Sequence, residues 1–149
     1  GRKIVVTEDW ESCVRGADIV VEASRLPEPQ PLLKTEWIKP GALVVPYGTM
    51  SAVELSLTDL ADKVVMDDWG QAHGIFGSLR EHVDTGRLTE DTLHAELGEI
   101  AAGLKPGREN DSETILFWHR GLSLSDIALG HAMLKKAHGL GVGQRLRFY

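Results

Sequence analysis

The sequence predicts an α/β fold built around a parallel sheet. Short runs of apolar, mostly β-branched residues recur along the chain, and stretches with the apolar spacing of a helix lie between them. The runs are almost continuously apolar, which is typical of strands that are covered on both faces of a sheet. With 149 residues, of which 42% are hydrophobic, the chain is large enough to bury the core that such a sheet needs.

The first part of the chain alternates between strand and helix. Residues 3–7 (KIVVT) predict a strand, residues 8–17 a short helix, and residues 18–24 (DIVVEAS) a second strand. Three prolines in residues 26–32 forbid a helix or a central strand, so this segment is expected to be an exposed loop. A short helix at residues 33–38 then ends at a Lys-Pro-Gly sequence.

Further strands and helices complete the predicted fold. Residues 42–48 (ALVVPYG), 63–67 (KVVMD) and 114–118 (TILFW) are expected to be strands. Helical spacing extends over residues 69–86, 92–104 and 122–139. In the second of these helices the residues expected to share an inward face are Leu93, Leu97, Ile100 and Ala101.

This layout is Rossmann-like, but the opening of a Rossmann fold is not found. A complete dinucleotide fold begins with a strand, a glycine-rich turn and a helix whose N-terminus holds the pyrophosphate. The glycine cluster of Gly139, Gly141 and Gly143 follows a helix, so it predicts a helix C-cap and a turn. We therefore expect an incomplete sheet without the first βαβ unit, which another segment or subunit must supply.

Composition and charge exclude several classes of function. The net charge of −6 comes without a basic stripe that could neutralise nucleic acid or an anionic membrane surface. No apolar run approaches the roughly 20 residues needed to span a bilayer. Cys13 is the single cysteine and cannot form an internal disulfide, which fits a reducing environment. We expect a soluble cytoplasmic protein that binds neither nucleic acid nor membranes.

Two groups of polar residues invite a metal-site interpretation, and the sequence favours a structural role for both. Asp67 and Asp68 end a predicted strand, where a solvated strand end with a helix cap is expected. His94, Glu96 and Glu99 lie around a mostly polar helix face. We expect no metal site. The four tryptophans show no alternation with basic residues and are expected to anchor the core or an interface.

Four stretches together resemble the ornithine cyclodeaminase and mu-crystallin family in order and spacing. They are GADIVVEAS, WIKPGALVVPYG, HAELGEIAAGLKPGR and ETILFWHRGLSLSDIA, and the match covers nearly the whole chain. The resemblance implies a homodimer in which a Rossmann domain binds NAD(H) or NADP(H) and a separate, mostly N-terminal domain binds substrate. Residues 1–121 would then be the C-terminal part of the Rossmann domain, and residues 122–149 a helix and tail that pack toward the missing substrate domain.

The resemblance also implies which residues line the site. Ser24 falls where the family has a Thr or Ser that touches the cofactor, and Tyr47, Gly48 and Thr49 fall on the loop beside the nicotinamide. His119 matches a family Ser near the nicotinamide, and Arg120 and Gly121 lie on the substrate side.

The residue types leave other roles open for these positions. A histidine after a strand can donate a proton near neutral pH, and an arginine can hold a substrate carboxylate. A packing histidine and a surface ion pair are the alternatives, and a plain turn is the alternative at Gly48.

One departure from the family pattern concerns a carboxylate. Cyclodeaminases carry an aspartate in the loop after the third strand of this chain, whereas residues 48–53 contain none; the matching position is Met50 or Gly48, depending on the register. The catalytic acid or base therefore stays unassigned.

We expect an NAD(P)H-dependent imine reductase or amino-acid dehydrogenase for a small amino or imino acid, with the chain inactive alone. The alternatives are an ornithine cyclodeaminase and a non-catalytic binding protein of the crystallin kind.

Overall fold

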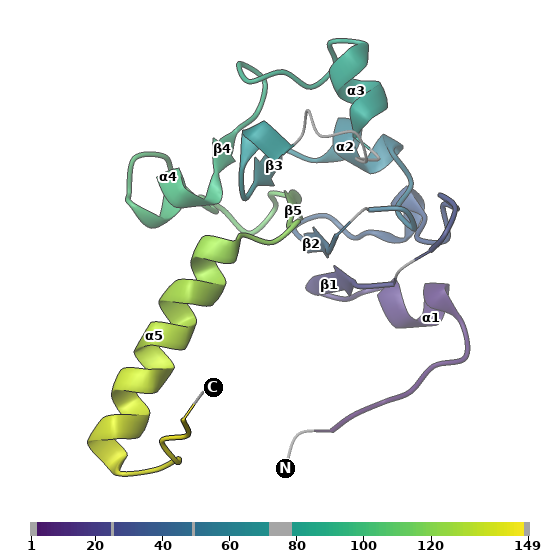
Figure 1. Ribbon diagram of the computed structural model, residues 1–149. Helices are drawn as coiled ribbons and strands as arrows, with labels where there is room; N and C mark the ends of the chain where they lie inside the picture. Colours follow the sequence, from purple (N-terminus) through teal and green to yellow (C-terminus); the bar gives the residue numbers. More distant parts are fainter. Residues whose placement is uncertain (1–2, 25, 49, 72–78, 148–149) are drawn as a thin grey trace.

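Five parallel strands form one sheet in the order β1-β2-β5-β3-β4 (Figure 1). The computed structural model describes residues 3–24, 26–48, 50–71 and 79–147. The strands are β1 (Ile19–Glu22), β2 (Leu43–Pro46), β3 (Lys63–Met66), β4 (Ala95–Glu96) and β5 (Ile115–Trp118). The last strand in the sequence is therefore the central one, and the predicted parallel α/β sheet is confirmed.

Burial of the strands increases from β1 toward the middle of the sheet. All four residues of β3 are buried, because β3 pairs with β5 on one side and with β4 on the other. In β1 only alternate residues are buried, and Ile19 and Val21 are each 63% exposed. The expectation that helices cover both faces is therefore wrong at β1. Among the described residues β1 pairs only with β2, so its other edge has unpaired backbone groups.

The expected strand at residues 3–7 is not formed. This segment has no ladder partner among the described residues, and Ile4 is 88% exposed. β-branched residues favour a strand only when neighbouring strands and a covered face are available to pack against. The segment leads instead into α1 (Trp10–Val14), which begins where the Asp9 side chain accepts a hydrogen bond from the Ser12 N–H at 2.7 Å.

Short helices connect the remaining strands. They are η1 (Thr35–Trp37), α2 (Ser56–Leu60), η2 (Trp69–Gln71), α3 (Arg80–Asp84) and α4 (Leu97–Ala101). The helix expected over residues 92–104 is partly wrong, because its first part is β4, which completes a ladder with β3. Leu97 is 40% exposed, so it does not face inward as expected. Part of the helix expected over residues 69–86 lies outside the described residues.

The C-terminal helix α5 (Ser123–Leu140) extends away from the sheet (Figure 1). It ends at Gly141, whose φ of 63° places the residue in the left-handed region, as the predicted C-cap requires. None of its residues is buried, and large apolar side chains are exposed along it, including Leu124, Ile127 and Met133. No described helix is long and apolar enough to cross a membrane.

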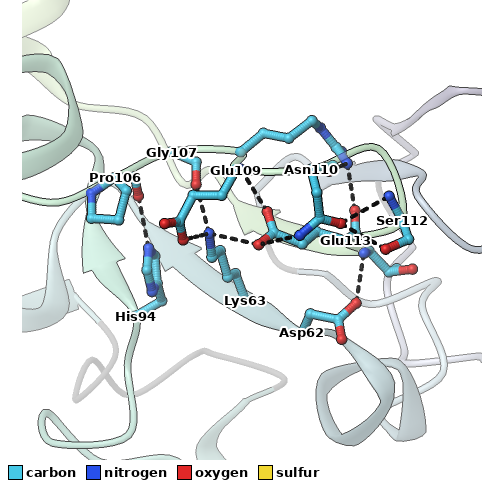
Figure 2. A network of polar contacts seen from close by, with 11 residues as sticks. Asp62, Lys63, His94, Pro106, Gly107, Glu109, Asn110, Ser112 and Glu113 are labelled. Atoms are coloured by element: carbon cyan, nitrogen blue, oxygen red, sulfur yellow. Dashed lines mark hydrogen bonds and ion pairs between the residues drawn. The ribbon is translucent and has the colours of Figure 1, made fainter.

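A buried lysine holds together the amino ends of the central strands. Figure 2 shows Lys63, the first residue of β3, whose ammonium group lies 2.6 Å from Glu109 and 3.0 Å from Glu113. It also donates to the Gly107 carbonyl at 2.8 Å. On the same edge, the Thr114 N–H donates to the Asp62 carboxylate at 2.7 Å. This network fixes the loop before β5 at the amino ends of the strands. It does not involve the carboxyl ends of the strands.

These contacts predict a pH dependence of stability. The Glu109 N–H and the Lys63 ammonium lower the pKa of Glu113 below its usual value of 4.5. A carboxyl whose pKa is lower in the folded state contributes stability above its unfolded pKa, and that stability is lost as the pH falls through the folded value. We expect Glu113→Gln to be less stable than wild type at pH 7 and to lose less stability between pH 5 and pH 3.

Urea denaturation at several pH values measures this difference. Asp84→Asn, which breaks the exposed pair between Arg80 and Asp84, is the control and is expected to change the free energy of unfolding little. Parallel acid-unfolding curves for wild type and Glu113→Gln would contradict the role of the Lys63 network.

Candidate functional site

The predicted site residues lie along the carboxyl ends of adjacent strands. Ser24 follows β1, Tyr47 and Gly48 follow β2, and His119 follows β5. In open parallel sheets this is the edge where ligands bind. The structure brings Tyr47 and His119 together in a parallel bridge, with their ring centroids 5.2 Å apart. The predicted residue Thr49 lies outside the described residues.

Ser24 is held by a buried carboxylate that sequence reasoning missed. Glu22, the last residue of β1, accepts hydrogen bonds from both the backbone N–H and the hydroxyl of Ser24. Its other oxygen, Oε2, is buried without a hydrogen-bond partner. Because the Ser24 hydroxyl donates to Glu22, its lone pairs are left to accept a hydrogen bond from a ligand. An acidic residue within an otherwise apolar strand was the available signal.

A hollow of about 370 Å³ lies beside these two residues, along the open edge of β1. Its lining includes Trp10 and Cys13 from α1 and the exposed strand residues Ile19 and Val21. All four residues of β1 line the hollow, so it lies where another element of the sheet could pack.

Gly48 presents open backbone at the site. Its φ is 81°, and nothing lies within 4 Å of the position that a Cβ atom would occupy. The Gly48 N–H donates to the His119 carbonyl at 2.9 Å, and its own carbonyl accepts from the buried Trp118 indole at 3.0 Å. The glycine is therefore fixed from both sides, and a flat group can approach it closely.

The side chain of Asp67 lies inside the site, and this corrects the sequence interpretation. We expected a solvated strand end, but the side chain is only 2% exposed. It accepts hydrogen bonds from the N–H groups of Asp68 at 3.0 Å and Gly121 at 2.6 Å. Its Oδ2 lies 3.2 Å from Nδ1 of His119. The signal was its position directly after a strand of four buried residues, at a carboxyl end.

Arg120 and Gly121 are tied to the segment that follows β3. The Arg120 guanidinium donates to the Gln71 carbonyl at 2.8 Å and lies 5.6 Å from the centre of the Trp118 ring. The Gly121 carbonyl accepts from the Gln71 side chain at 3.3 Å. A guanidinium has five N–H donors, so the bond to Gln71 leaves donors for a ligand carboxylate.

The other polar groups bond within the fold, although His94 and Glu96 lie before and in β4 and not on the expected helix. His94 is hydrogen-bonded to the Pro106 carbonyl at 2.8 Å. Glu96 accepts from the Trp69 N–H at 2.7 Å, and its own N–H donates to Glu99, which lowers the pKa of Glu99. Asp68 accepts from the Gly70 N–H at 2.7 Å. Within the part of the chain that the structure describes, no group of three His, Cys, Asp or Glu side chains could hold a metal ion.

The loop after β2 places no carboxylate at the site among its described residues. Met50, one of the two positions that match the family aspartate, is 1% exposed and packs in the core. Its φ of 59° is a left-handed conformation that non-glycine residues rarely adopt. Gly48, the other matching position, has no side chain. The buried carboxylates at this edge come instead from β1 and from the end of β3.

Three proteins show what the chain is similar to. The N-((2S)-2-amino-2-carboxyethyl)-L-glutamate dehydrogenase of Staphylococcus aureus is 30% identical over 97% of this chain and 42% of its own length. The Thermococcus litoralis Delta(1)-pyrroline-2-carboxylate reductase, solved with NADH and L-proline, superposes with a TM-score of 0.75 at 28% identity, over 94% of this chain and 44% of that one.

An archaeal alanine dehydrogenase dimer with bound NAD superposes with a TM-score of 0.73 at 30% identity, over 93% of this chain and 43% of that one. The chain thus spans less than half the length of these relatives. The family model described as ornithine cyclodeaminase/mu-crystallin family matches residues 1–139. The chain therefore belongs to the ornithine cyclodeaminase/mu-crystallin family.

Proposed function

We propose that this chain is the nicotinamide-side part of an NAD(P)H-dependent imine reductase or amino-acid dehydrogenase that acts on a small amino or imino acid. The observation that carries the proposal is the line of Ser24, Tyr47, Gly48 and His119 along the carboxyl ends of β1, β2 and β5. Similarity to a pyrroline-2-carboxylate reductase and to amino-acid dehydrogenases supports this class of reaction.

The described residues fit a nicotinamide nucleotide. The open backbone of Gly48 can accept a flat ring, and the Ser24 hydroxyl can accept a hydrogen bond from the cofactor. The partnerless oxygen of Glu22 is a further acceptor beside them. When bound, NAD(P)H supplies a hydride for the imine carbon, and the protein orients the reactants. Both NAD and NADP stay within the proposal.

Arg120 and Gly121 form the substrate side of the proposed site. Amino and imino acids carry a carboxylate, which a planar guanidinium can bind with two parallel hydrogen bonds. The Arg120 side chain is partly buried and anchored by Gln71, so its position is set before substrate arrives. Gly121 has no side chain to fill the space next to Arg120. A Cβ atom at Gly121 would occupy part of that space, 3.8 Å from the Tyr47 hydroxyl.

The rest of the complete protein is also part of the proposal. The open edge of β1 and the exposed apolar residues of α5 are surfaces for a further segment or subunit that brings a glycine-rich turn and a substrate domain. Residues 1–121 then belong to the dinucleotide-binding domain, and residues 122–149 pack toward the substrate domain. We propose a cytoplasmic homodimer and expect the chain alone to be inactive.

Transfer of deuterium tests the proposed reaction. We expect the complete protein to transfer one deuterium, as deuteride, from C4-deuterated NAD(P)H to the α-carbon of an amino acid when it is supplied with a cyclic 2-imino acid or with a 2-oxo acid and ammonia. Mass spectrometry of the product measures the label. Conversion of ornithine to proline and ammonia without net cofactor oxidation would show a cyclodeaminase instead, and ligand binding without any turnover would show a binding protein.

Arg120→Ala tests the substrate side. A charge-assisted hydrogen bond contributes about 1.5 to 3 kcal/mol, so we expect KM for the imino or oxo acid to rise at least about tenfold. The affinity for NAD(P)H should stay unchanged. Arg80→Ala, on the exposed helix α3, is the control. A KM equal to that of wild type would remove Arg120 from the substrate site, and a parallel loss of cofactor affinity would place it on a phosphate.

A further inference from the structure

The carboxylate of Asp67 is buried beside the place proposed for the reaction. Burial of a polar group is costly unless it is hydrogen-bonded, and the N–H groups of Asp68 and Gly121 satisfy part of this requirement. Asp67 directly follows β3, which is paired on both sides, so its position is set by the centre of the sheet. The carboxylate still faces one further group, the imidazole of His119.

His119 is fixed by its backbone and by its neighbours. Its N–H donates to the Pro46 carbonyl at 3.1 Å, and its ring lies 5.2 Å from the ring of Tyr47 and 5.5 Å from that of Phe117, measured between centroids. The side chain is 31% exposed, whereas Nδ1 is buried. The exposed surface of the imidazole is therefore on the side away from Asp67.

The contact between the two side chains is close but not yet a hydrogen bond. Nδ1 lies 3.2 Å from Oδ2 of Asp67, which suits an ion pair, but the alignment leaves Nδ1 without a hydrogen-bond partner. Hydrogen bonds in active sites are often poorly aligned until substrate binds, so the distance fits a contact that tightens at that point. The Asp67 carboxylate lies within reach of Nδ1, so the neutral ring is expected to carry its proton there.

Reduction of an imine needs a proton as well as a hydride. We propose that His119 is the catalytic acid that protonates the imine nitrogen, and that Asp67 is the positioning residue that orients the imidazole and stabilises its protonated form. The inference rests on the proposed imine reduction and names the source of its proton. An aspartate that holds a histidine in this way is a general device for directing the other ring nitrogen at substrate.

The step balances in atoms and electrons. When bound, NAD(P)H would supply the hydride for the new C–H bond at the imine carbon, and the π electron pair of the C=N bond would take the proton from Nε2 of His119. The imine is reduced to an amine, NAD(P)H is oxidised to NAD(P)⁺, and the imidazole is left neutral and regains a proton from water. In the dehydrogenase direction the neutral imidazole accepts that proton.

Among the described residues, three titratable or charged groups lie beside the imidazole in space or along the chain. They are Asp67 after β3, Tyr47 after β2 and Arg120 next along the chain. The Arg120 guanidinium is bonded to the Gln71 carbonyl, and the Asp68 carboxylate is turned to the Gly70 N–H. The Asp67 carboxylate is therefore the charged group in close contact with the ring.

Single-turnover hydride transfer in the complete protein at saturating NAD(P)H tests the catalytic role. General acid catalysis contributes about 10² to 10⁴-fold, so His119→Gln should slow the step by at least 100-fold. Asp67→Asn should slow it about tenfold, because the imidazole loses the carboxylate that orients it. The controls are His94→Gln and Asp84→Asn, whose side chains lie away from this edge.

Nitrogen-15 NMR of histidine-labelled complete protein tests the pairing without any turnover. We expect the neutral His119 ring to carry its proton on Nδ1 in wild type and to lose this preference in Asp67→Asn. A proton on Nε2 in wild type, or the same preference for Nδ1 in Asp67→Asn, would overturn the pairing. If wild type transfers hydride and the rate of His119→Gln is within threefold of the wild-type rate, the catalytic role of His119 is overturned. The pairing with Asp67 is not affected by that result. If wild type transfers no hydride, the proposed function fails, and the NMR result still decides the pairing.

Discussion

The carboxylate of Asp67 is the contact on which the geometry of the site depends. It directly follows the fully buried strand β3 and accepts hydrogen bonds from the N–H groups of Asp68 and Gly121, so it joins the loops that follow β3 and β5. Loss of one partner of a buried hydrogen bond leaves the other unsatisfied, at a cost of about 1–3 kcal/mol. His119 and Arg120 are the two residues before Gly121, so their placement depends on the hydrogen bond between Gly121 and Asp67.

The amino ends of the strands carry contacts that stabilise the fold, whereas the carboxyl ends carry the candidate site. At the amino ends, Lys63 binds two glutamates and a carbonyl and closes the loop before β5. At the carboxyl ends, polar groups are left in part unsatisfied, such as Oε2 of Glu22 and Nδ1 of His119. Unpaired polar atoms in a buried position are costly, and two of the five such side-chain atoms among the described residues lie at these strand ends, where open parallel sheets bind ligands. The other three belong to Thr58 and His82.

Much of the sheet could be predicted from sequence, because its strands are short apolar runs bounded by glycine, proline and charged residues. The runs at residues 42–48, 63–67 and 114–118 contain β2, β3 and β5. The segment 3–7 has an equally apolar run, yet it forms no strand, because a strand needs a partner that local composition does not reveal. β4 was missed because its two residues are set by pairing with β3 alone.

The candidate site was only half predictable for a related reason. Ser24, Gly48 and His119 follow apolar strands. The spacing of the stretches that resemble the family predicts them as site residues. Glu22 and Asp67 are part of the strands or their ends, and their burial depends on which neighbours the fold places beside them. The parallel order β2-β5-β3 brings His119 beside Asp67, although the two are far apart in sequence.

We propose that nicotinamide chemistry takes place along the carboxyl ends of β1, β2 and β5. A crystal structure of the complete protein with bound NAD(P)H measures this most directly. We expect the nicotinamide ring to lie against the backbone of Gly48, with the exposed side of the His119 imidazole facing the reacting carbon and Asp67 hydrogen-bonded to Nδ1. A nicotinamide ring bound away from Gly48 and His119 would contradict it.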